Sequence, residues 1–183
     1  MPIFKINTKM NDKDYLEFNY YTMNKTEHGK KNMRNIKILY SFVFLIVYVW
    51  FLILNRFSFY SFFLIIPLGI ALLATVLPKN FFGRHTLKIV LSVYKKGKKP
   101  YSPESTIEFY EDSFVETTEN SKQENKYESI YSVCVFNNNY IYIYINPALA
   151  YIFKISDFKS VNEYREFMDF IKTKTDKIII TEK

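Results

Sequence analysis

Two long uncharged runs dominate the pattern of apolar and polar positions along the chain. They cover Ile38–Leu54 and Phe57–Leu77, and only two residues separate them. A helix that crosses about 30 Å of hydrocarbon needs roughly 17–25 apolar residues, and both runs meet that requirement. A buried helical pair in a soluble protein is disfavoured, because such helices rarely run this long without a charge. The pattern therefore predicts a transmembrane helical hairpin with spans at residues 36–54 and 57–77.

The segment before the first span indicates a short strand followed by a short helix. Polarity alternates over Pro2–Asn7, and Asn11 is a good N-cap for a helix with the apolar stripe Leu16, Tyr20 and Met23. A lone strand and a short helix are not stable by themselves. We therefore expect this N-terminal segment to pack on the C-terminal part of the chain.

The pattern changes twice after the second span. Residues 79–99 are basic, with Leu87, Val90, Leu91 and Tyr94 on one helical face, which predicts a basic amphipathic juxtamembrane helix. From Tyr101 the period becomes two, which is typical of strands. The expected strands are Ser105–Tyr110, Phe114–Glu119, Tyr127–Phe136, Tyr140–Ile145 and Tyr151–Ile155, with a polar loop at 121–126.

A final amphipathic helix follows the strands. Ser160 and Glu163 have the spacing of a capping box at its start. A strongly curved antiparallel sheet has an open end, and such a helix can close it. The order of elements is that of pleckstrin-homology-like (PH-like) barrels, an analogy of fold that says little about function. The predicted fold class is thus an α+β membrane protein: a two-helix transmembrane hairpin plus a small antiparallel PH-like sheet or barrel closed by a C-terminal helix.

A strict alternation of tyrosine and isoleucine stands out in the fourth predicted strand. Tyr140, Tyr142 and Tyr144 share one face of that strand, and the isoleucines share the other. We expect the isoleucines to face the core together with Cys134. The three tyrosines either lie against other protein, such as the N-terminal strand and helix, or form an exposed aromatic surface for interaction.

Lysine and arginine are concentrated on both sides of the apolar runs, whereas the turn between the runs has Arg56 alone. Positive charge stays cytoplasmic, so the sequence predicts a two-span protein of the cell membrane with both termini in the cytoplasm. The bases either only set this topology or also bind anionic lipid headgroups. Candidate membrane-surface contacts are Lys30, Lys31, Arg34, Lys79, Arg84, Lys88, Lys95, Lys96, Lys98 and Lys99.

Composition excludes several classes of protein. The 183 residues are 49% hydrophobic and 19% aromatic, which is incompatible with disorder, and the net charge is +7. We expect no nucleic-acid binding, because the bases flank spans while the tyrosines lie in a net-acidic region. Acidic residues are expected on a solvated face of the sheet; they are Glu104, Glu108, Glu111, Asp112, Glu116, Glu119 and Glu124.

Residues with catalytic or metal-binding chemistry are few. His28 and His85 are the two histidines, and each lies in a basic stretch without neighbouring ligands. The single Cys134 lies in an apolar strand, where a small buried hydrophobe is the expected role. We therefore expect neither a metal site nor a cofactor nor an enzyme.

The chain resembles the YcxB-like family of small bacterial membrane proteins. The resemblance rests on "DKDYLEFN", the basic and apolar segments, "IEFYEDSFVETTENSK", "YESIYSVCVFNNNYIYIYI" and "AYIFKISDFKSVNEYREFMDFIK". Two residues common in the family are absent here: a Trp near Ser129 and a Pro near Phe153. The resemblance implies a membrane protein with a PH-like cytoplasmic domain and no established functional site.

The predicted domain organisation has four parts: an N-terminal strand and helix (1–35), the hairpin (36–78), the juxtamembrane helix (79–99) and the PH-like domain (100–183). We expect a non-catalytic interaction module at the cytoplasmic face of the membrane. Its partners would be the lipid bilayer, and a protein or a second copy of the chain. The alternative is a subunit or regulator of a membrane transport or stress-response complex.

Overall fold

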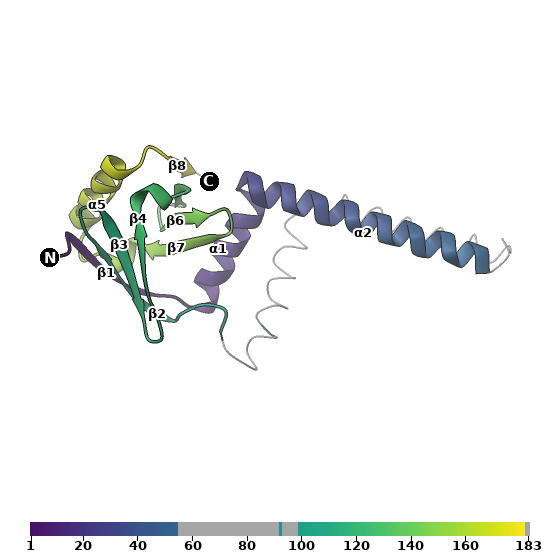
Figure 1. Cartoon of the computed structure of the whole chain (residues 1–183), viewed down its shortest axis with the longest axis horizontal. Coiled ribbons are helices and arrows are strands. Elements are labelled where there is room, and N and C mark those ends of the chain that lie inside the picture. The colour runs from purple at the N-terminus through teal and green to yellow at the C-terminus, as the bar shows by residue number, and fades with distance from the viewer. Residues whose placement is uncertain (55–91, 93–98, 182–183) are drawn as a thin grey trace. The chain divides into compact units, whose positions relative to one another are not determined.

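The computed structural model describes residues 1–54, 92 and 99–181 (Figure 1). The predicted second span at 57–77 and nearly all of the juxtamembrane helix predicted at 79–99 lie outside the described residues. The elements are β1 (Phe4–Lys9), α1 (Asp12–Asn24), α2 (Glu27–Leu54), β2 (Glu104–Phe109), β3 (Ser113–Thr118), β4 (Lys122–Lys126), η2 (Tyr127–Ser129), β5 (Ser132–Phe136), β6 (Tyr140–Asn146), β7 (Leu149–Lys154), η3 (Ile155–Asp157), α5 (Val161–Lys174) and β8 (Ile178–Thr181).

The chain divides into two compact units. One joins Met1–Asn19 to Lys88–Lys183, and the other is Tyr20–Leu87. The first unit is therefore discontinuous in sequence, and β1 is the reason. This strand is hydrogen-bonded antiparallel to β2 although about a hundred residues separate them, with Ile6 opposite Ile107.

The described strands of the first unit form two four-stranded sheets. The first has the order β1-β2-β3-β4 and is entirely antiparallel; the second has the order β7-β6-β5-β8. In the second sheet, β5, β6 and β7 are antiparallel and β8 runs parallel to β5. The sequence predicts the antiparallel hairpins, and the structure confirms a mixed α+β fold with antiparallel sheets and a C-terminal helix.

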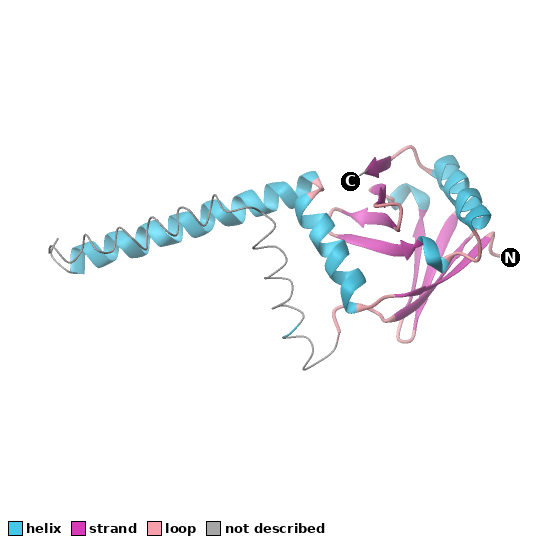
Figure 2. Ribbon diagram, turned by 180° about the vertical axis from the view of Figure 1, so that it is seen from behind, coloured by secondary structure: helices cyan, strands magenta, loops and turns pink. Residues whose placement is uncertain are grey.

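One hydrophobic core fills the space between the sheets and reaches α5, which lies at one end of them (Figure 2). Its members come from both sheets and from the helix face that carries Phe167 and Ile171, both fully buried. The rings of Phe109 and Phe167 lie edge to face with centroids 4.9 Å apart. Burial of aromatic area of this kind dominates the energetics of small cores.

Helix starts and one tight turn follow the sequence closely. Asn11 Oδ1 accepts hydrogen bonds from the backbone N–H groups of Lys13 and Asp14, at 2.9 and 3.0 Å, as expected of an N-cap. Ser160 Oγ accepts from the Glu163 N–H at 3.1 Å and begins α5. Asn137 and Asn138 turn β5 into β6 with positive φ, a conformation that asparagine tolerates.

Three predictions about elements are wrong. The polar loop predicted at 121–126 contains β4, because strand pairing with β3 satisfies its backbone although its side chains are polar. The strand β8 lies beyond the predicted last element. In α1 the residues Leu16, Tyr20 and Met23 are only partly buried, and the most buried positions are Asp14, Phe18 and Tyr21.

The second unit contains α2, in whose apolar part most of the described side chains are exposed. The segment Glu27–Trp50 is long and apolar enough to cross a membrane, with mean hydropathy 1.4 over its best window and none of that window buried. Phe42, Ile46 and Trp50 have exposed fractions of 59%, 54% and 64%. This is the single helix of that kind among the described residues.

Candidate ligand pocket between the two sheets

The inward-facing side chains change character along the strands. The register sets Phe109 opposite Phe114 and then Ile107 opposite Glu116, and the next inward residue of β2 is Ser105. The aromatic end of this series lies against α5. The interior therefore becomes polar toward the end of the sheets that is distant from α5.

An inner pocket of about 230 Å³ occupies this polar end, between the two sheets and the first turns of α1. Its polar lining includes Thr8, Ser105, Glu116, Gln123 and Tyr151, together with Tyr15, Tyr101 and Ser102. Its apolar walls include Phe18, Ile107, Ile145 and Ile152. A concave, largely apolar site with a few convergent polar groups is the usual form of a small-molecule site, and barrel mouths are a frequent place for one.

Several polar groups of the inner pocket are held in place by hydrogen bonds. The hydroxyls of Thr8 and Ser105 lie 2.9 Å apart and join β1 to β2. Asn125 Nδ2 donates to the Tyr151 hydroxyl at 2.8 Å, which joins β4 to β7. These bonds link elements that belong to both sheets, so the polar rim has a defined geometry.

Glu116 is the carboxylate of the inner pocket. It lies opposite Gln123 of β4 and is partly buried. Burial raises the pKa of Glu116 above its usual value, and a hydrogen bond with Ser105 partly opposes that rise. Burial, reinforced by the charge of Glu116, also raises the pKa of Tyr151 to about 12. Both shifts reflect the low polarity of the space that these side chains share.

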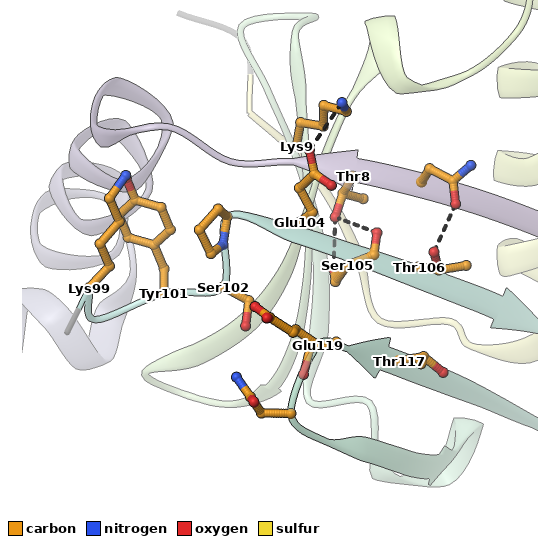
Figure 3. Close-up of a pocket in the computed structure, with 14 residues that line it drawn as sticks. Thr8, Lys9, Lys99, Tyr101, Ser102, Glu104, Ser105, Thr106, Thr117 and Glu119 are labelled. Atoms are coloured by element: carbon orange, nitrogen blue, oxygen red, sulfur yellow. Dashed lines mark hydrogen bonds and ion pairs between the residues drawn. The ribbon is translucent and has the colours of Figure 1, made fainter.

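A wider open groove of about 920 Å³ adjoins the inner pocket, and the two share Thr8, Tyr101, Ser102 and Ser105. Figure 3 shows the groove at the ends of β1, β2 and β3, with Lys99 and Tyr101 beside α1. Lys9 Nζ and Glu104 Oε1 form an ion pair of 3.1 Å on its rim. The groove is thus lined by hydroxyls and by charges of both signs, and it gives the inner pocket access to solvent.

The predicted tyrosine surface is not exposed. Tyr142 and Tyr144 have exposed fractions of 0% and 1%, so the hypothesis of an open aromatic patch is wrong for them. Phe18 of α1 covers them, with ring centroids 5.4 and 5.9 Å away. Tyr140 is partly buried, and its hydroxyl donates to Asp14 Oδ1 at 3.0 Å. The alternative expectation, contact with the N-terminal helix, is the one that the structure confirms.

Asp14 anchors α1 to the second sheet. Its carboxylate accepts from Tyr140, from the Asn11 N–H at 3.2 Å and from Lys154 Nζ at 3.1 Å. The Asp14 side chain has an exposed fraction of 6%, and that of Lys154 has 24%. Lys154 Nζ also donates to the Lys9 carbonyl at 2.6 Å. This Asp14 clamp, defined by Asp14, Tyr140 and Lys154, fixes α1 over the tyrosine row and at the mouth of the inner pocket.

The predicted membrane-surface residues are only partly described. Lys30, Lys31 and Arg34 lie exposed in the first turns of α2, and Lys99 is exposed before β2. Lys79, Arg84, Lys88, Lys95, Lys96 and Lys98 lie outside the described residues.

Cys134 is buried and its thiol is not in a disulfide, as expected, but it lies on the other face from that predicted. It is opposite Tyr142, so it shares the tyrosine face and not the isoleucine face. His28 is exposed on α2, and His85 lies outside the described residues. Within the described ranges, no three His, Cys, Asp or Glu side chains are grouped to hold a metal ion.

Sequence reasoning missed Glu116. It grouped this residue with six other acids on a solvated face, which is wrong for Glu116 because it is partly buried between Ile107 and Gln123 of the same sheet and lines the inner pocket. The alternation from Phe114 could have revealed it, because residues two apart on a strand share a face. A carboxylate on the same face as a core phenylalanine is the signal of an inward charge.

Comparison with known proteins adds one match. Residues 109–171, from the end of β2 into α5, match the family model of the YcxB-like protein. This segment includes Glu116, Gln123 and Tyr151 of the inner pocket, and it confirms the resemblance over these residues. Searches of curated proteins and of solved structures found no match.

Proposed function

We propose that this chain, which carries the YcxB-like pattern over residues 109–171, is a two-span membrane protein whose PH-like domain acts in the cytoplasm as a non-catalytic interaction module. The pairing of β1 with β2 is the observation that carries the proposal. It joins residues on either side of the apolar part of the chain in one sheet.

The β1–β2 pairing constrains any topology in a membrane. Because the two strands belong to one sheet, the segments before α2 and after residue 98 must lie in the same compartment. A chain that crosses the bilayer through α2 must therefore cross back between residues 55 and 98. The apolar run Phe57–Leu77 is long enough to do so. The bases at both ends of the hairpin favour the cytoplasm as the shared compartment.

Two features support a PH-like module at that location. Two four-stranded sheets enclose one core, and α5 covers its apolar end. Several acidic side chains of this unit are engaged in structural contacts: Asp14 in the clamp, Glu108 in an ion pair with Lys5 at 2.8 Å, and Asp157 with the Lys154 N–H. These three carboxylates are held by cationic or backbone partners, and we infer that their role is structural.

The topology can be tested by labelling introduced cysteines in intact cells with a membrane-impermeant maleimide. The buried Cys134 provides a low background, so the unchanged chain is the control. We expect Arg56→Cys, in the hairpin turn, to react in intact cells. Glu128→Cys, exposed in η2, should react only after permeabilisation. Reaction of Glu128→Cys in intact cells would contradict the proposed orientation.

A further inference from the structure

We propose that the inner pocket binds a small alkylammonium compound, with the protonated amine at Glu116 and a short apolar chain against the isoleucine walls. This goes beyond the proposed membrane topology and does not depend on it, because every residue of the argument belongs to the unit that contains the two sheets.

The charge of the pocket selects a cation. Among the residues that the structure describes, its lining contains one carboxylate, that of Glu116, and no Lys, Arg or His. An anion would lie beside Glu116 without a compensating base. A cation would instead offset the cost of burying the carboxylate, which is high for an unpaired charge.

The hydrogen-bonding groups of the inner pocket favour a ligand whose polar end carries several N–H donors. A primary ammonium carries three N–H donors and no acceptor. Side chains that line the pocket with Glu116 carry oxygen atoms from three further strands: Ser105 of β2, whose hydroxyl also bonds Thr8, Gln123 of β4, which is exposed, and Tyr151 of β7. Tyr151 already accepts from Asn125, so its geometry is fixed before a ligand enters.

The apolar walls and the volume of the inner pocket limit the character and size of the rest of the ligand. Ile107, Ile145 and Ile152 come from both sheets and provide an apolar surface beside the polar groups. The half-open volume of about 230 Å³ has room for several water-sized groups. A chain of about five carbons with one ammonium group is therefore of suitable size.

The test compares three probes that share a five-carbon chain: pentylammonium, 1-pentanol and pentanoate. The full chain in lipid nanodiscs is titrated, and the backbone amide NMR signals of Ser105, Glu116 and Gln123 are followed. We expect saturable shifts with pentylammonium at neutral pH. We expect the neutral and the anionic probe to bind at least about tenfold more weakly, a difference of about 1.4 kcal/mol.

Matched variants separate the pocket from unspecific uptake into lipid. Glu116→Gln keeps the shape of the side chain and removes its charge, and we expect it to weaken pentylammonium binding at least about tenfold. Glu128→Gln removes an exposed charge outside the pocket and should leave the affinity unchanged. Signal dispersion in the same spectra reports whether each variant is folded.

Three outcomes would overturn the proposal. Equal affinities for pentylammonium and 1-pentanol would show that the site is an apolar cavity without preference for a cation. Unchanged pentylammonium binding in a folded Glu116→Gln variant would show that the cation does not bind at Glu116. Absence of any shift at the pocket residues would also contradict it. None of these outcomes bears on the membrane topology, which the cysteine labelling tests separately.

Discussion

At the scale of single residues, the charge of Glu116 is expected to favour the proposed binding of a cation but to lower the stability of the fold. Because burial raises its pKa in the folded state, the folded chain holds this proton more tightly than the unfolded chain does. The stabilising contribution is therefore complete below the usual glutamate pKa near 4.5 and is lost as the pH rises through the higher folded-state value. Where the pH is high enough for Glu116 to ionise in the folded chain, its ionised side chain opposes folding.

We accordingly expect Glu116→Gln to raise the midpoint of thermal unfolding at neutral pH and to change it less near pH 4. Circular dichroism melts at both pH values, with Glu128→Gln as the control, provide the measurement. The titratable groups that line the pocket with Glu116 are Tyr15, Tyr101 and Tyr151. A lower melting temperature for Glu116→Gln at neutral pH would mean that the carboxylate is already compensated in the folded protein.

Loss of the Asp14 clamp should destabilise the fold, in contrast to the stabilisation expected for Glu116→Gln. Asp14→Ala removes the acceptor of Tyr140 and the partner of Lys154, and it also removes the acceptor for the Asn11 N–H. Because the Asp14 side chain is only 6% exposed and its partners would lose a carboxylate acceptor, we expect a loss of about 1–3 kcal/mol in the free energy of unfolding. Urea denaturation measures it.

A comparison with Lys5→Ala controls for the removal of an ion pair as such. The Lys5–Glu108 pair lies on the surface, with the Lys5 side chain 57% exposed, so that variant should lose clearly less stability than Asp14→Ala. Equal losses in the two variants would argue against a special role for the clamp.

At the scale of elements, α5 completes the core. Its Phe167 is fully buried and contacts the rings of Phe4, Phe109 and Phe153. We expect Phe167→Ala to cost about 3–5 kcal/mol of unfolding free energy, because it leaves a cavity between the sheets. Val161→Ala, at an exposed position of the same helix, is the matched change and should be nearly neutral. If Phe167→Ala and Val161→Ala lowered the free energy of unfolding by similar amounts in denaturation, α5 would not be needed for the core.

An element can be predicted from the sequence when its own residues show an apolar period, a turn or a helix cap. The hairpin β5–β6 is predictable because apolar runs flank an asparagine turn, and α5 is predictable because its cap and stripe agree. β4 is not, since "KQENK" has no apolar period and pairs through its backbone with β3. The inner pocket is not predictable either, because it depends on how Glu116, Gln123 and Tyr151 come together from three strands.

At the scale of the whole molecule, we expect the second apolar run to be needed for assembly of the unit that contains the two sheets. We expect deletion of residues 57–77 to place β1 and β2 in different compartments, which leaves the edge of β2 unpaired. The chain should then be degraded or misfolded, as measured by its level in membranes and its sensitivity to protease. Normal accumulation of a protease-resistant domain in the deletion variant would contradict the two-span hypothesis.

Replacement of residues 57–77 by an unrelated leucine-alanine span separates a tether from a packed subunit. A tether needs only length and apolarity, so folding and function should both be restored. A subunit of a transport or stress-response complex needs specific helix contacts, so folding would return without function. Co-purification of partners from mild detergent distinguishes the two cases.

The pairing of Thr8 with Ser105 also has a consequence for biosynthesis. At about 5–20 residues per second, β1 leaves the ribosome roughly 5–20 seconds before its partner strand is synthesised. If the chain spans the membrane twice, as proposed, the β1–β2 ladder can form only after both spans have inserted. A chain whose two flanks emerged on opposite sides would keep an unpaired edge on β2, and we expect a protease to recognise it.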